Sequence, residues 1–217
     1  MNKNKYLHVV LPHRGVAAGK SRLSAVLDDA ARSELNRWLL SRTLRIVAAC
    51  LGEAQRCVVV SPCISTLTLA RHAGASTLTE RVPALGLNAA LAQGAAYAAM
   101  LGAQRLLILP CDLPLLDIAA WEAMLALPGS DGDVVVAPDR HGTGTNAMLV
   151  DATMRAFAFG AGSLARHVAT ATARGARVWT CHHPALAFDL DTEADFSQWM
   201  HSSAALPPFL AARRAAA

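Results

Sequence analysis

The 217-residue chain is long enough to bury one substantial core, and its 53% hydrophobic content fits a single well-packed domain. A net charge of +4, without a run of basic residues interleaved with aromatics, argues against nucleic acid and favours a small anionic ligand. No apolar stretch approaches the length of a membrane span, and the polar N-terminus lacks the apolar core of a signal peptide, so we expect a cytoplasmic protein that binds no membrane.

Short apolar runs alternate with amphipathic segments along the chain. The runs predict strands at 7–11, 57–60, 106–109, 134–136, 147–150 and 176–181. Helical periodicity lies between them, at 31–50, 65–73, 87–101, 118–127 and 163–174. This alternation predicts an α/β fold, a three-layer, mostly parallel sheet in one domain over residues 1–200. Residues 201–217 show no clear pattern, and we expect a tail that is flexible or contacts a second copy in a homodimer.

The loop after the first predicted strand carries the first sign of function. Lys20 is the only lysine beyond the N-terminal tip, and Arg14 and Arg22 lie on either side of it. The segment 15–21 resembles a P-loop, but only three residues separate its glycines where four are needed to wrap a phosphate. Three cations around flexible glycines nevertheless favour a phosphate site over a solvated loop.

Three aspartates form the second group of candidates. Asp112 follows the third predicted strand, and ligands of open α/β sheets gather at the carboxyl ends of strands; capping of the next turn is the alternative role. In extended backbone Asp189 and Asp191 project to one side with about 6.6 Å between their Cα atoms, which suits one hard cation. Alternatively, Asp191 or Thr192 caps a helix over 193–200, and both roles can hold for different residues.

A third group is rich in glycine and hydroxyl side chains. HGTGTN at 141–146 and FGAGS at 159–163 precede the last long predicted helix. Exposed amides, hydroxyls and a helix N-terminus suit a phosphate or carboxylate, although glycine-rich turns of this kind are more often structural.

Together these segments resemble one known family. The opening from Pro12 to Leu23 is similar to the PxKxxxxAKSRL motif of the 2-phospho-L-lactate guanylyltransferase family, the CofC-type enzymes of coenzyme F-420 biosynthesis. Further matches follow in the same order, and the resemblance covers about residues 7–200. They are VSP at 60–62, GLNAAL at 86–91, LPCDLPLL at 109–116, APDR at 137–140, GTNA at 144–147, FGAGSLARH at 159–167 and DLDT at 189–192.

The resemblance implies a nucleotide-diphospho-sugar-transferase-like Rossmann fold with a mixed sheet. It also implies the transfer of GMP from GTP to a small phosphorylated acid, with release of pyrophosphate. The acids associated with the family are 2-phospho-L-lactate, phosphoenolpyruvate and 3-phospho-D-glycerate. GTP and one such acid are therefore the expected partners.

The resemblance also assigns roles to residues of this chain. One or two Mg²⁺ ions would be bound by Asp112, Asp189 and Asp191, which with Lys20 form the implied catalytic set. The nucleotide would be bound by Arg14, Lys20, Arg22, Ser61, Pro62, Asn88 and Asp112. The phosphorylated acid would be bound by Thr145, Gly160 and Ser163.

The chain departs from the family pattern at three places. Arg14 stands where the family commonly has lysine, which keeps the charge, and Gly19 replaces an alanine. VPAL at 82–85 stands where a glycine-rich stretch usually precedes GLN, and this bears on how the base and ribose are held.

Other functions remain open at this point. A molybdenum-cofactor-type or sugar-phosphate nucleotidyltransferase would share the fold and the release of pyrophosphate, whereas a P-loop kinase would transfer the γ-phosphoryl group instead. A nucleotide-binding protein without catalysis is the alternative from another class.

Overall fold

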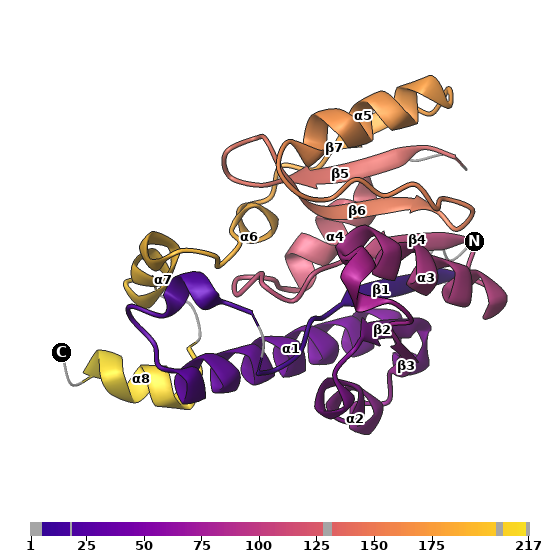
Figure 1. Ribbon diagram of the computed structural model, residues 1–217. Coiled ribbons are helices and arrows are strands. Elements are labelled where there is room, and N and C mark those ends of the chain that lie inside the picture. Colours follow the sequence, from indigo (N-terminus) through magenta and orange to yellow (C-terminus); the bar gives the residue numbers. More distant parts are fainter. Residues whose placement is uncertain (1–5, 18, 128–131, 203–205, 216–217) are drawn as a thin grey trace.

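The computed structural model describes residues 6–17, 19–127, 132–202 and 206–215, without the side chains of 213–215. Within these ranges one seven-stranded sheet is covered by helices on both faces (Figure 1). The strands are β1 (Leu7–Pro12), β2 (Cys57–Ser61), β3 (Ser76–Thr79), β4 (Arg105–Ile108), β5 (Val134–Pro138), β6 (Thr145–Asp151) and β7 (Val178–Thr180). The α-helices are α1 (Asp29–Leu51), α2 (Ile64–His72), α3 (Leu87–Met100), α4 (Ile118–Ala126), α5 (Ser163–Ala173), α6 (Pro184–Ala187), α7 (Glu193–Met200) and α8 (Pro208–Ala215). Short 3-10 helices are η1 (Ser21–Leu23), η2 (Ala54–Arg56) and η3 (Pro83–Leu85).

The sheet is mixed and mostly parallel, which confirms the predicted fold class. Its strand order is β3-β2-β1-β4-β6-β5-β7, and β6 runs antiparallel to both of its neighbours while the other pairs are parallel. All of the predicted strands are present. The edge strand β3 was not predicted, because its sequence STLT contains a single large apolar residue and pairs with β2 alone. No helix in the described part of the chain has both the length and the apolar character needed to cross a membrane.

Alternate residues of the central strand β1 pack into opposite layers. Val9 and Leu11 belong to a core shared with α1 and α4, whereas Val10 belongs to the core shared with α3. Because β1 is buried on both faces, its carboxyl end is held rigidly, and the loop that carries Lys20 begins there.

A third apolar cluster lies beside this loop and joins distant parts of the chain. Its members include Leu23 of η1, Leu35 of α1 and Trp199 of α7, together with Leu190 in the segment before α7. In the C-terminal segment, α8 packs into the same cluster through the fully buried Leu210, and its predicted contact with a second copy stays a prediction. In Figure 1 α8 lies beside the N-terminal end of α1, so the described part of this segment folds against its own chain.

The close packing of α3 on the sheet can be tested at Gly94. A Cβ added there would lie 2.6 Å from Val10 Cγ1 and 2.7 Å from Val60 Cγ2. Replacing glycine by alanine in an exposed helix stabilises it by about 1 kcal/mol. We expect Gly94→Ala instead to lower the free energy of unfolding by about 1–3 kcal/mol, because the helix must move off the sheet.

Urea denaturation measures this change. The exposed Ala96 of the same helix provides the control, since Ala96→Leu should shift the free energy of unfolding by less than about 0.5 kcal/mol. A Gly94→Ala protein as stable as the wild type would mean that α3 does not approach β1 and β2 this closely.

Candidate active site

The carboxyl ends of β1 and β4 open onto a cavity of about 310 Å³. Lys20, Asp112 and Asp191 all line this cavity, and Arg14 lies on its wall. The fold therefore brings together one predicted cation loop and two of the predicted aspartates, which lie far apart in the sequence.

Lys20 is the centre of this arrangement. Its ammonium donates to the backbone carbonyl of Leu190 and to Asp191 Oδ1 at 3.2 Å, and lies 3.6 Å from Asp112 Oδ2. Only 8% of the Lys20 side chain is exposed. Lys20 is also the one described non-glycine residue with a positive φ, at 54°. Such a backbone costs on the order of 1–3 kcal/mol and is typical of functional sites.

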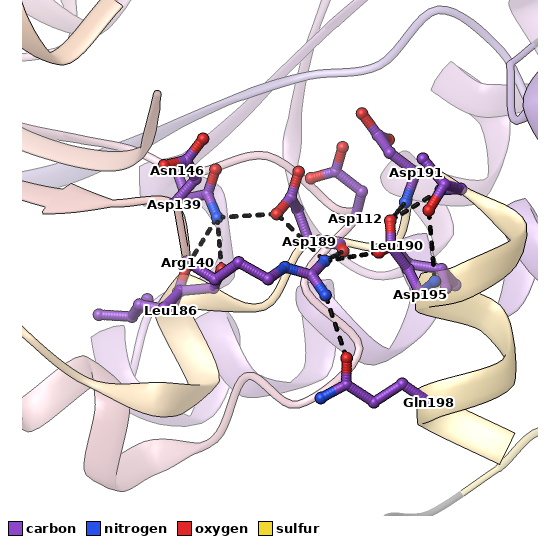
Figure 2. Close-up of polar contacts among 12 residues, drawn as sticks. Asp112, Asp139, Arg140, Asn146, Leu186, Asp189, Leu190, Asp191, Asp195 and Gln198 are labelled. Atoms are coloured by element: carbon purple, nitrogen blue, oxygen red, sulfur yellow. Dashed lines mark hydrogen bonds and ion pairs between the residues drawn. The ribbon is translucent and has the colours of Figure 1, made fainter. Parts of the chain in front are cut away.

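Asp189 lies next to this group and is held by two partners (Figure 2). Arg140 donates to the Asp189 backbone carbonyl at 2.6 Å, and its guanidinium lies 3.7 Å from the Asp189 carboxylate. The amide of Asn146 donates to the same carboxylate at 3.4 Å. In Figure 2 the side chains of Asp189 and Asp191 project to the same side of their segment, as extended backbone predicts.

The three predicted aspartates influence one another electrostatically. Burial raises the pKa of Asp189, and the negative charges of Asp112 and Asp191 raise it further. Around this point four carboxylates, including that of Asp195, face the two cations Lys20 and Arg140.

The same aspartates do not form a closed metal site in this structure. Among the described residues no three His, Cys, Asp or Glu side chains converge as a metal-binding group. Lys20 lies between Asp112 and Asp191 instead. The donor chemistry nevertheless fits Mg²⁺, because the oxygens are hard ligands and negative charge is in excess.

The start of α7 decides between the two capping alternatives. The Thr192 hydroxyl accepts from the Asp195 amide at 3.3 Å, and Asp195 Oδ2 accepts from the amides of Asp191 and Thr192 at 2.9 and 2.7 Å. Thr192 is therefore the cap, and the alternative in which Asp191 caps this helix is wrong. The Asp191 carboxylate remains available to Lys20 and the cavity.

The residues predicted to bind the acid form a second polar group. The buried Thr145 amide donates to Ser163 Oγ at 2.8 Å, and Thr145 Oγ1 lies 3.0 Å from His167 Nδ1. Because His167 Nε2 accepts from the Ala158 amide at 3.1 Å, the neutral ring carries its hydrogen on Nδ1 and donates it to Thr145. The Thr145 hydroxyl hydrogen is thus free to point elsewhere. Gly160 is exposed, with φ 119°, in the turn before α5.

The remaining nucleotide candidates have different placements. Pro62 lines a second cavity of about 260 Å³. Ser61 is buried at the end of β2, and its hydroxyl accepts a backbone N–H two residues further on. The Asn88 side chain both donates to and accepts from the backbone of Phe159, which lines the first cavity. Arg22 is exposed and is not among the residues that line either cavity.

Four further residues support the site and were not predicted. Arg140 and Asn146 lie in the APDR and GTNA motifs, so the sequence contained a signal for them. His13 Nδ1 accepts from an amide at 3.1 Å and the Asn36 amide donates to a carbonyl at 3.2 Å, and together they hold the loop backbone at 15–16. As single polar residues in a loop and on a helix, these two carry no sequence signal.

Comparison with known proteins places the chain in a family. The family model described as guanylyl transferase CofC like matches residues 7–205. The chain belongs to this family. A phosphoenolpyruvate guanylyltransferase of Rubrobacter xylanophilus is 41% identical over 191 residues, which cover 87% of this chain and 91% of the relative. A 3-phospho-D-glycerate guanylyltransferase of Phenylobacterium zucineum is 38% identical over 189 residues, which cover 86% of each chain.

Solved structures support the same fold at low identity. A nucleotidyl transferase from Methanothermobacter thermautotrophicus matches with a TM-score of 0.63 and 14% identity, covering 90% of this chain and 96% of that one. A 4-diphosphocytidyl-2C-methyl-D-erythritol synthase from Anaerococcus prevotii matches with a TM-score of 0.61 and 9% identity, covering 90% and 94%. The nucleotidyltransferase-like fold that the CofC-like family resemblance implied is confirmed.

Two histidines of this CofC-like chain are neutral in the folded state. Burial, together with the charge of Lys20, lowers the pKa of His13 to about 4. Burial, together with the charge of Arg166, lowers the pKa of His167 to about 4 as well. An unfolded histidine has a pKa near 6.5, so the unfolded chain binds more protons than the folded one below that pH.

We therefore expect the free energy of unfolding to fall as the pH decreases from about 6.5 to 4. The fully buried His167 should contribute on the order of 2–3 kcal/mol of this loss. Urea denaturation at a series of pH values should show a weaker pH dependence for His167→Gln than for the wild type. The exposed His72 serves as the control, and His72→Gln should leave the slope unchanged. Equal slopes for His167→Gln and the wild type would contradict the neutral assignment.

Proposed function

We propose that this chain transfers GMP from GTP to a small phosphorylated carboxylic acid and releases pyrophosphate, as a cytoplasmic step of coenzyme F-420 biosynthesis. Membership of the CofC-like family supports the reaction class. The candidate acceptors are phosphoenolpyruvate and 3-phospho-D-glycerate, which appear in the names of the two relatives, with 2-phospho-L-lactate as the third.

The contact of Lys20 with Asp112 and Asp191 carries this proposal. It places a largely buried ammonium and two carboxylates on the wall of one cavity at the carboxyl ends of the strands. A triphosphate that enters this cavity would find positive charge from Lys20 and Arg14. Polar groups that converge in a cavity in this way are typical of a ligand-binding site.

The reaction requires alignment rather than a side-chain nucleophile. A phosphate oxygen of the acid attacks the α-phosphorus of GTP, and a new P–O bond forms as the bond to the bridging oxygen breaks. Pyrophosphate leaves with the electron pair. The acid's phosphate is already ionised at neutral pH, so no general base is needed. The Lys20 ammonium stabilises the charge that grows on the leaving pyrophosphate.

Three aspartates would bind Mg²⁺ in this proposal, namely Asp112, Asp189 and Asp191. Bound there, one or two ions would neutralise the triphosphate and fix its orientation. Arg140 supports the role of Asp189 by holding its backbone carbonyl.

The acid is assigned to Thr145, Gly160 and Ser163. Support comes from the Thr145 hydroxyl, whose orientation His167 fixes, and from the N-terminus of α5, which begins at Ser163 and favours an anion.

Incubation of the purified protein with GTP, Mg²⁺ and each acid in turn tests the function. We expect pyrophosphate release that depends on one of the three acids, with no GDP. Formation of GDP would instead indicate γ-phosphoryl transfer and contradict the proposal. Pyrophosphate release with a sugar 1-phosphate but with none of the acids would also contradict it.

Removal of one aspartate tests the proposed metal role. We expect Asp189→Asn to lower kcat by about 100-fold or more, because loss of a metal carboxylate costs several kcal/mol in the transition state. The apparent Mg²⁺ requirement should rise at the same time. Steady-state kinetics over a Mg²⁺ titration measure both effects.

Asp151 provides the matched control. It lies at the opposite end of β6, and its carboxylate accepts from the Thr153 amide, a role that asparagine can also fill. Asp151→Asn should therefore retain normal turnover and Mg²⁺ dependence. Full turnover by a folded Asp189→Asn protein would exclude Asp189 from the metal site.

A further inference from the structure

The second cavity adjoins the first and extends it. It has a volume of about 260 Å³ and shares Pro12, His13, Arg14 and Leu87 with the cavity that holds Lys20. One ligand can therefore lie across both, with its phosphates at the Lys20 end. The second cavity is somewhat smaller than the pockets of about 300–1,000 Å³ that enclose drug-sized ligands, and it suits a single heterocycle.

The walls of this second cavity are mostly apolar, and the polar side chains of His13, Arg14 and Glu80 also line it. Apolar side chains contribute most of its surface, including those of Val60, Pro62, Pro83 and Leu87. Glu80 is the only carboxylate among the residues that line it. Within the described part of the chain, the Glu80 carboxylate has no hydrogen bond or ion pair. A carboxylate in this position can accept hydrogen bonds from a ligand that enters the cavity.

We propose that Glu80 selects guanine in this cavity, an inference that rests on the proposed use of GTP. A carboxylate only accepts hydrogen bonds, and its two oxygens can receive two neighbouring N–H groups. Guanine presents such a pair on its Watson–Crick edge, from N1–H and the N2 amino group. Adenine and cytosine present an unprotonated ring nitrogen at the corresponding position, which a carboxylate repels. Glu80 is thus a specificity-determining residue.

The backbone on both sides of Glu80 is fixed. The Glu80 amide donates to the Ser61 carbonyl at 3.0 Å, next to the end of β2. Gln93 of α3 accepts from the Arg81 amide at 3.0 Å and donates to the Thr79 carbonyl at 2.8 Å. The backbone position of Glu80 is therefore fixed before a base arrives, which lowers the entropy lost on binding. In this arrangement Ser61 acts on the nucleotide indirectly, because its backbone carbonyl holds the Glu80 amide.

Comparison of GTP with ITP isolates the proposed contact, because inosine lacks only the N2 amino group. We expect the wild type to prefer GTP over ITP in kcat/KM by at least about tenfold. In Glu80→Gln this preference should fall to about twofold or less, chiefly through loss of activity on GTP. If the role of Glu80 were purely structural, Glu80→Gln would lower kcat/KM equally for GTP and ITP and leave their ratio unchanged.

Glu122 of α4 provides the control, since it is exposed and lines neither cavity. Glu122→Gln should keep the wild-type ratio. Circular dichroism checks the fold of each variant, and Glu80→Asp, which retains the charge with a shorter reach, serves as the second variant if Glu80→Gln does not fold. A folded variant at position 80 with the wild-type GTP to ITP ratio would overturn the assignment, as would a wild type without any GTP preference.

Binding measured without an acceptor separates this inference from the proposed function. Calorimetric titration with GTP and with ITP should show the same loss of preference in Glu80→Gln. Selective GTP binding that depends on Glu80, without guanylyl transfer to any acid, would contradict the proposed function and retain the guanine site. Guanylyl transfer with a GTP preference that is independent of Glu80 would support the proposed function and contradict the guanine site.

Discussion

A single ammonium joins three parts of the chain that are far apart in sequence. The Lys20 ammonium contacts the Leu190 carbonyl and the carboxylates of Asp112 and Asp191, with 8% of its side chain exposed. The largely buried ammonium is compensated by these two carboxylates, whose side chains are 35% and 46% exposed. The backbone supports the same contact, because the Leu190 amide donates to the Asp112 carbonyl at 2.9 Å. The Lys20 backbone itself has the unfavourable left-handed conformation that is typical of functional sites.

Local patterns in the sequence were sufficient to predict much of this arrangement. Asp112 follows a short apolar run, and an α/β alternation brings the carboxyl ends of parallel strands to one edge. The spacing of Asp189 and Asp191 gives them a common side, and the sequence predicts a helix over 193–200 capped by Asp191 or Thr192. Each of these features depends on neighbours within a few residues. They could therefore be predicted without knowledge of tertiary contacts.

Features that depend on tertiary contacts could not be predicted. Strand β3 is short and mostly polar, and it exists because β2 offers it a pairing edge. Helix α8 is fixed by burial of Leu210 against η1, α1 and α7, and no local sequence pattern predicts this packing. The Ser61 hydroxyl accepts a backbone N–H in a local turn, and the contact with the nucleotide that its motif suggests stays a prediction. In each case the partner is distant in sequence or the motif is shared between structural and binding roles.

The placement of Arg140 shows how the fold can hold an aspartate without occupying its carboxylate oxygens. Arg140 donates to the Asp189 carbonyl, pairs with Asp195 at 3.0 Å and stacks on the Phe188 ring at 4.4 Å, so most of its interactions avoid the Asp189 carboxylate. A bidentate pair with that carboxylate would occupy both of its oxygens. At 3.7 Å the guanidinium offsets part of the Asp189 charge only. Burial and the negative charges of Asp112 and Asp191 raise the pKa of Asp189, and this accumulated negative charge is what a divalent cation would neutralise.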